Sequence, residues 1–153
     1  MLRLLVLACV LSACAPVGRG VYGDGTRAGE ELATITRPGA WLVAPASYPV
    51  FLEVDGQEVQ AYHCGDSALP LVRVHPGRHV VTLVYHYRWY DFVNTHRECS
   101  RPMRFELHAE PGHVYDVVRD GSVPSPLALR LEVRDRATGA VVATPERTAG
   151  EGS

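Results

Sequence analysis

The stretch from Val72 to Trp89, VRVHPGRHVVTLVYHYRW, determines the predicted fold. It predicts two strands that fold back on each other at the HPGR turn, residues 75–78. In the longer strand one face carries Val81, Leu83, Tyr85, Tyr87 and Trp89, and the other carries Val80, Thr82, Val84, His86 and Arg88. Alternation of apolar and mixed faces indicates the centre of an antiparallel sheet, with its apolar face in the core and its mixed face toward solvent.

Short alternating segments separated by turn sequences continue on both sides of this hairpin. The expected strands are residues 32–36, 48–54, 57–63, 101–109, 114–119, 127–134 and 140–144. Asp55-Gly56 is a two-residue hairpin signal, and Pro111-Gly112 suits a type II turn. No window has sustained helical periodicity. We therefore predict an all-β protein, an antiparallel β-sandwich of about seven to nine short strands, with a partly open β-barrel as the alternative.

The side-chain pattern also predicts which residues of two strands face inward. In 48–54 we expect Val50, Leu52 and Val54 on the core side. In 57–63 we expect Val59 and Ala61 on the core side.

The N-terminus, MLRLLVLACVLSAC from Met1 to Cys14, has a short positive start, an apolar run and small residues, the layout of an export signal. Its last four residues, Leu11-Ser12-Ala13-Cys14, resemble the lipobox of bacterial lipoproteins. The resemblance implies cleavage before Cys14 and acylation, palmitate included, at that residue, which would anchor the chain in a membrane. The alternative is an ordinary secretory signal with an incidental cysteine.

This signal sets the expected domain organisation. Residues 1–13 are the lipoprotein signal peptide, 14–30 the lipidated cysteine and a flexible Gly-rich tether, 31–145 the β-sandwich, and 146–153 a disordered tail. Ala15 follows the cysteine; by resemblance to enterobacterial lipoproteins this implies sorting to the outer membrane, facing the periplasm.

Three segments of the folded part resemble a second group. They are FLEVDGQ from Phe51, VHPGRHVVTLVY from Val74 and FELHAEPGHVYDVV from Phe105. They are similar to small bacterial lipoproteins of uncharacterised function that share V-D-G, P-G-x-H and A-x-x-G-x-x-Y motifs. This resemblance covers about the middle half of the chain. It implies a transthyretin-like or immunoglobulin-like sandwich and no catalytic residues.

Two cysteines remain once the signal is set aside. Cys9 lies in the signal and Cys14 is the proposed lipidation site, which leaves Cys64 and Cys99. An even pair in an oxidising compartment predicts a structural disulfide. A redox or metal-binding thiol pair is the alternative, and no C-x-x-C spacing supports it.

Composition and motifs exclude several functions. The net charge is −2 and the chain has no lysine, which argues against a nucleic-acid partner and excludes lysine-based catalysis. The sequence from Gly18 to Gly23 fits G-x-G-x-x-G, but no strand precedes it and no helix follows, so we discard it. G-x-S-x-G, H-E-x-x-H and phosphate-loop motifs are absent. We expect a non-enzymatic protein without a cofactor.

Seven histidines are the one excess with chemical potential. His75 and His79 flank the central turn, and His86 and His108 fall on the mixed faces of their strands, where we expect solvent. Neighbouring strands could assemble a zinc or copper site there, although no ligand spacing is diagnostic.

The segment from Arg88 to Arg101, RWYDFVNTHRECSR, predicts a long connecting loop rich in aromatic residues and arginine. Such residues dominate binding hot spots. In the alternation of the long strand, Trp89 falls on the side that faces the core. We interpret Tyr90, Arg97, Phe92 and Arg88 as a binding patch. The alternative is that Trp89 and Phe92 cap the end of the core while the arginines are solvated.

The favoured function is therefore a lipid-anchored, non-enzymatic binding or assembly module of the cell envelope. Its partner would be an envelope protein or cell-wall glycan. The alternative is a metal-binding envelope lipoprotein that uses exposed histidines.

Overall fold

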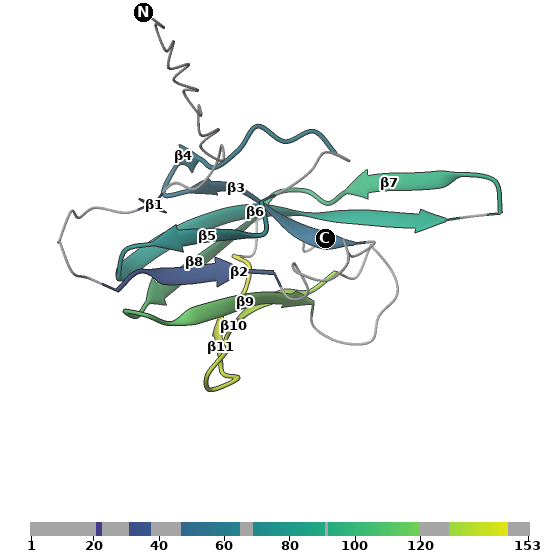
Figure 1. Ribbon diagram of the computed structural model, residues 1–153. Coiled ribbons are helices and arrows are strands. Elements are labelled where there is room, and N and C mark those ends of the chain that lie inside the picture. The colour runs from purple at the N-terminus through teal and green to yellow at the C-terminus, as the bar shows by residue number, and fades with distance from the viewer. Residues whose placement is uncertain are drawn as a thin grey trace, which may run out of the picture.

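The protein is an all-β sandwich, as the sequence predicts. The computed structural model describes residues 21–22, 31–37, 47–64, 69–90, 92–119 and 129–146, without the side chains of residues 89 and 90. These residues contain eleven strands and no helix, and the strands form two sheets (Figure 1). Across the same ranges, no helix has the length and apolarity that a membrane span requires. The signal and Cys14 lie outside the described residues.

Sheet A has six strands. In spatial order they are β1 (Val21–Tyr22), β5 (Leu71–Val74), β2 (Ala33–Thr36), β9 (Val114–Arg119), β10 (Leu131–Asp135) and β11 (Val141–Ala143). Its pairs are antiparallel except for β1 with β5 and β2 with β9, which are parallel. The antiparallel expectation therefore holds for most of the sandwich, and the parallel pairs arise where strands distant in sequence meet.

Sheet B has five strands and is organised around β6. Its order is β4 (Gln57–Glu58), β3 (Tyr48–Val54), β6 (Gly77–Tyr90) and β7 (Thr95–Cys99), with β8 (Met103–Ala109) also paired to β6. The fourteen-residue β6 lies in the stretch that the sequence places at the centre. It pairs with β3, β7 and β8, all antiparallel.

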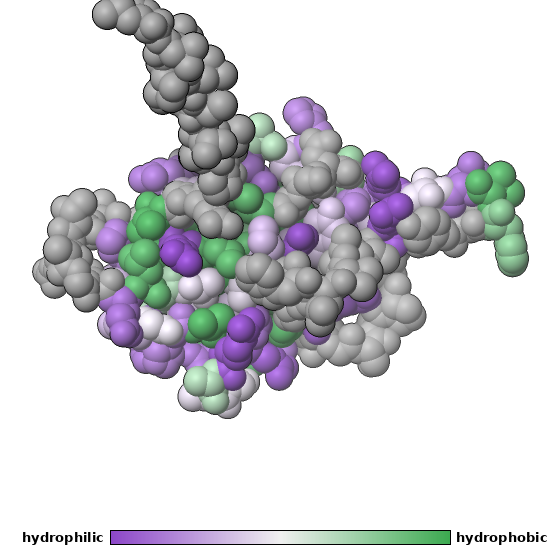
Figure 2. Space-filling view, viewed as in Figure 1, coloured by the Kyte–Doolittle hydropathy of each residue, from purple (hydrophilic) through white to green (hydrophobic). Residues whose placement is uncertain are grey.

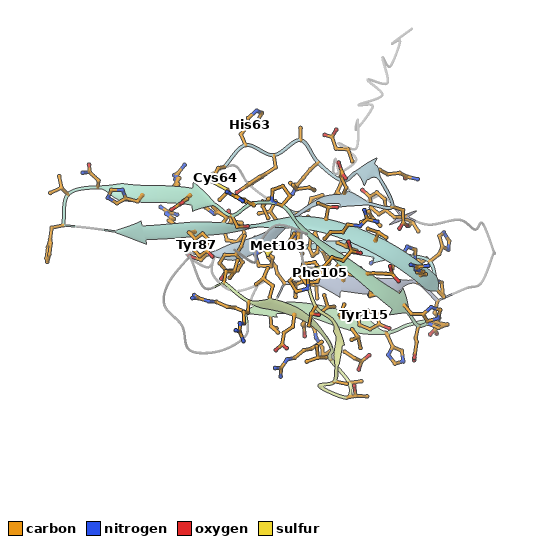
Figure 3. The ribbon with its side chains drawn as sticks, turned by 180° about the vertical axis from the view of Figure 1, so that it is seen from behind. His63, Cys64, Tyr87, Met103, Phe105 and Tyr115 are labelled. Carbon is orange, nitrogen blue, oxygen red and sulfur yellow. A yellow bond between two sulfur atoms is a disulfide. The ribbon has the colours of Figure 1, made fainter. Side chains whose placement is uncertain are left out.

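The predicted inner face of β6 is confirmed from Val81 to Tyr87, and the side chain of Trp89 lies outside what the structure describes. Val81, Leu83, Tyr85 and Tyr87 are buried in one core cluster between the sheets. Figure 3 shows Tyr87, Met103, Phe105 and Tyr115 in this interior. The other buried members of the cluster are Tyr22, Ala33, Ile35, Phe51, Val54, Val59, Val72, Val74, Leu107, Ala109, Val117, Leu131, Val133 and Ala143.

An irregularity in β3 corrects the predicted faces of that strand. Phe51 pairs with Leu83 and Glu53 with Thr82, so the ladder skips Leu52. The extra residue changes the alternation, and Phe51 and Val54 both enter the core cluster. Val50 pairs with Val84 on the outer face and Leu52 is only half-buried, so the prediction that these two residues face the core was wrong.

Three further segments differ from the predictions. The expected tether contributes β1, where Tyr22 is buried and its carbonyl accepts a hydrogen bond from the His75 backbone. The strand expected over 57–63 ends at Glu58, and Ala61 is exposed. The expected loop after Arg88 is largely strand, because β6 runs to Tyr90 and β7 follows. At the C-terminal end, Glu146 donates a backbone hydrogen bond to Arg104, while residues 147–153 lie outside the described residues.

Candidate functional site

The C-terminal end of β6 and the whole of β7 form a two-stranded arm that projects from the sandwich (Figure 1). The last residue of β6 that pairs with β3 is His86, opposite Tyr48. From Tyr87 to Tyr90 the strand pairs only with β7. We call the residues from His86 to Cys99 the arm. An isolated two-stranded ribbon has few contacts of its own, so its base must be held by the rest of the protein.

Ser100 sits at the junction where β7 passes into β8. Both strands pair with the same edge of β6, but their registers differ by one residue. The hydroxyl of Ser100 accepts a hydrogen bond from the Tyr85 backbone, and the Ser100 N–H donates to the Tyr85 carbonyl. The side chain thus satisfies the backbone donor at the point where the ladder changes register.

A disulfide holds the base of the arm. Cys64 and Cys99 are bonded with their Cα atoms 5.9 Å apart, which confirms the predicted bridge. It ties the segment that follows β4 to the end of β7, and Figure 3 shows Cys64 beside the arm. A cross-link over 35 residues stabilises the folded state by about 3–4 kcal/mol in the chain-entropy model.

The tip of the arm exposes two large apolar side chains. Phe92 is 110% exposed and Val93 85%, the highest values among the exposed large hydrophobic residues of the described ranges. Figure 2 shows an isolated hydrophobic tip at the end of the projection. The alternative expectation that Phe92 caps the sandwich core is therefore wrong, because the arm carries it away from the body.

The base of the arm gathers aromatic and basic side chains on its outer face. Tyr48 and His86 face each other across β3 and β6, with ring centroids 4.9 Å apart. The guanidinium carbon of Arg37 lies 4.2 Å above the centre of the Tyr48 ring, a cation–π contact. Arg88 and Arg97 are directly opposite each other on the next rung of this face. We call these five residues the arm-base cluster.

His86 is buried within this cluster, contrary to the prediction that it faces solvent. It is 2% exposed, and neither ring nitrogen has a hydrogen-bond partner among the described residues. The pKa of His86 is lowered, first because burial disfavours the charged ring and then because Arg97, Arg88 and Arg37 repel added charge. The prediction failed because the outer face of this part of sheet B is covered: Val50 and Val84 beside it are also buried.

The opposite end of β6 carries the second candidate site, a polar hollow of about 470 Å³ beside the HPGR turn. It is lined by Asp55, Gln57, His75, Pro76, Gly77, Arg78 and His79. Nδ1 of His79 lies 2.7 Å from Oδ2 of Asp55, and Nε2 lies 2.6 Å from the His75 carbonyl oxygen. Both ring nitrogens of His79 therefore face oxygen acceptors, so the ring has no free nitrogen to act as a general base.

The four histidines named as metal candidates do not converge. His86 is at the arm base, and His108 is exposed opposite Arg78 at the other end of β6. His79 contacts the backbone of His75 rather than its ring. In the part of the chain that the structure describes, no three His, Cys, Asp or Glu side chains are grouped to hold a metal ion.

His113, which sequence reasoning missed, contacts two carboxylates. Nδ1 of His113 lies 2.5 Å from Oδ2 of Asp135, and Nε2 lies 3.3 Å from Oε2 of Glu110. The pKa of His113 is raised, chiefly by the hydrogen bond to Asp135. The pKa of Asp135 is lowered to about 2 by His113 and by the Thr138 backbone N–H. Because Asp135 also fixes the β10–β11 turn through Thr138, we interpret this pair as structural.

The four residues predicted as a binding patch all lie on the arm. Phe92 is at its tip, Arg88 and Arg97 form a rung at its base, and Arg97 is exposed while Arg88 is half-buried. The backbone of Tyr90 closes the last rung with Thr95, and its side chain lies outside what the structure describes.

Comparisons of the chain with family models, curated proteins and solved structures found no match in any of the three.

Proposed function

We propose that this chain is a lipid-anchored, non-enzymatic binding module of the bacterial cell envelope that holds an envelope protein through its arm. One observation carries the proposal: the disulfide-braced arm presents Phe92 and Val93, both strongly exposed, at its tip. Apolar side chains at the centre of an interface supply much of its binding energy when they enter a pocket of the partner. Their exposure on a projecting ribbon fits insertion into a partner better than packing within this chain.

The proposed anchor and the arm are compatible in space. Six residues, 15–20, separate Cys14 from β1, and an extended chain of that length spans at most roughly 20 Å. A lipid on Cys14 would therefore keep the β1 edge near the membrane surface. Figure 1 places β1 and the tip of the arm on opposite sides of the molecule, so the arm would extend away from the anchored edge.

The chemistry of the candidate sites supports a binding role. In the hollow, the hydrogen bonds of His79 to Asp55 and to the His75 carbonyl occupy both ring nitrogens. At the arm base, the lowered pKa of His86 reflects a buried ring among arginines, with no carboxylate to orient it as a base among the five residues of the cluster.

Two experiments test the two parts of the proposal. Cys14→Ser should move the protein from the membrane fraction to the soluble fraction; unchanged membrane association would contradict the anchor. Affinity purification from cells should recover one protein in near-equal amount. The double variant Phe92→Ser/Val93→Ser should lose it.

The matched control is Val141→Ser/Val142→Ser, which removes two exposed apolar side chains from β11, away from the arm. This variant should keep the partner. Loss of the partner in both double variants, or in neither, would contradict binding through the tip.

A further inference from the structure

The arm-base cluster concentrates positive charge on one face of the arm. Arg88 and Arg97 are directly opposite each other, an arrangement in which like charges repel. The acid of β7, Glu98, pairs with Tyr87 and therefore points to the other face of the arm. Arg97 is exposed and Arg88 is half-buried, so ions in solution can reach this arginine rung at Arg97.

His86 lies on the same face, two residues before Arg88. The residue is 2% exposed, and both ring nitrogens lack a hydrogen-bond partner within the described residues. A buried polar group without a hydrogen-bond partner lowers the stability of the folded protein. A ligand that accepts a hydrogen bond from this group would remove that cost. The ring is held by its edge contact with Tyr48, which is itself covered by Arg37.

We propose that the arm-base cluster binds a phosphate-class oxyanion, which Arg97 and Arg88 hold by charge and to which His86 donates a hydrogen bond. The oxyanion would supply the acceptor that His86 lacks and place a negative charge beside the arginines. Guanidinium groups suit this ligand because their planar N–H groups match the spacing of two phosphate oxygens. Arg97 is exposed, so it is the part of the cluster that an ion in solution would meet first.

Two sources supply such an oxyanion, the dissolved ion and a group carried by a larger molecule, and the site chemistry is the same for both. Inorganic phosphate represents the free ion, and vesicles containing phosphatidylglycerol represent a phosphate in a lipid headgroup. This site is independent of the apolar tip, so its failure would leave the proposed function of the arm intact, and the reverse also holds.

The test follows the His86 ring signals by NMR in the purified, disulfide-bonded protein. At matched ionic strength, phosphate or phosphatidylglycerol vesicles should shift these signals, whereas chloride and phosphatidylcholine vesicles should not. A shift with phosphate identifies a free ion as sufficient, and a shift with the anionic vesicles alone identifies a headgroup. No shift with either would overturn the proposal.

Two exposed arginines provide the matched comparison. Arg97→Gln should weaken binding roughly tenfold because it removes a charge-assisted contact. Arg101→Gln removes an equal charge just beyond the arm and should leave the affinity unchanged; equal weakening in both variants would show a nonspecific charge effect and overturn the site.

The pH dependence of sulfate binding tests the role of His86. A bound oxyanion favours the charged ring, against the repulsion from Arg37, Arg88 and Arg97, with Tyr48 the remaining neighbour. Sulfate keeps a constant charge, so its affinity should increase as pH falls from about 7.5 to about 5.5. In His86→Phe the residual affinity should be independent of pH over this range. The same pH dependence in that variant would exclude His86 from the site.

Discussion

Asp55 and His79 join the β3–β4 turn to the start of β6 by a hydrogen bond of 2.7 Å between Oδ2 and Nδ1. The other carboxylate oxygen of Asp55 accepts from the Val80 backbone N–H at 2.8 Å. Asp55 belongs to the β3–β4 turn, where its φ is +52°. One side chain therefore fixes the β3–β4 turn against the start of the longest strand.

Removing this carboxylate should destabilise the sandwich. Asp55→Ala leaves the buried His79 ring and the Val80 N–H without their acceptor, and we expect the free energy of unfolding to fall by about 2–3 kcal/mol. Urea denaturation measures this change. Glu106→Gln breaks the exposed ion pair with Arg78 and serves as the control, because exposed pairs contribute little. Equal losses in the two variants would contradict a specific role for Asp55.

The disulfide should control the stability of the arm. Replacing Cys64 and Cys99 together by Ser should lower the free energy of unfolding by about 3–4 kcal/mol. In this variant the backbone amides of β7 should exchange with solvent faster than in the parent protein. The increase should be larger in β7 than in β10, which lies in the other sheet. Unchanged exchange in β7 would show that the bridge does not hold the arm.

His86 is expected to limit stability. His86→Phe removes two buried nitrogens that lack partners among the described residues and keeps a ring beside Tyr48, so it should raise the free energy of unfolding by about 1 kcal/mol. The lowered pKa of His86 adds a pH effect: its contribution is fully present above the unfolded value of 6.5 and is lost as pH falls toward the folded pKa. Denaturation at several pH values should show this loss in the parent protein and not in the variant.

The His113–Asp135 pair should produce two opposite pH effects. The pKa of Asp135 is lowered from 3.8 to about 2, so its contribution is present above pH 3.8 and is lost as pH falls through about 2. The pKa of His113 is raised above 6.5, so its contribution is present below 6.5 and is lost as pH rises through the folded pKa.

Replacing the residue that titrates should remove the corresponding pH effect on stability. In Asp135→Asn the acid effect should be absent, and in His113→Gln the alkaline effect should be absent. NMR titration of the His113 ring measures its pKa directly. A value at or below 6.5 in the parent protein would contradict the assignment.

Local chemistry made much of the fold predictable. Asp55-Gly56 predicted the hairpin, and both residues have the positive φ that such a turn requires. The motif ending in Tyr115 also has a physical basis: Gly112 has a φ of +73°, and the Tyr115 hydroxyl accepts a hydrogen bond from the Glu110 N–H. The even pair of cysteines, together with the oxidising compartment that the signal leads us to expect, predicted the bridge between Cys64 and Cys99.

Long-range packing explains what the sequence pattern missed. β1 is a two-residue strand whose only signal was Tyr22, and its position depends on pairing with β5, which is distant in sequence. β7 has no apolar alternation because it lies on an arm rather than over the core. The burial of His86 depends on cover from residues elsewhere in the chain, which the alternation within β6 does not encode.

Crosslinking from the tip of the arm in living cells tests the central claim most directly. A photoreactive amino acid would replace Phe92 in the full-length protein, and a second variant would carry it at Val142, an exposed position on β11. We predict one envelope protein crosslinked from position 92 and absent from position 142. The same products from both positions, or none from position 92 with the protein correctly anchored, would contradict a partner-binding role for the arm.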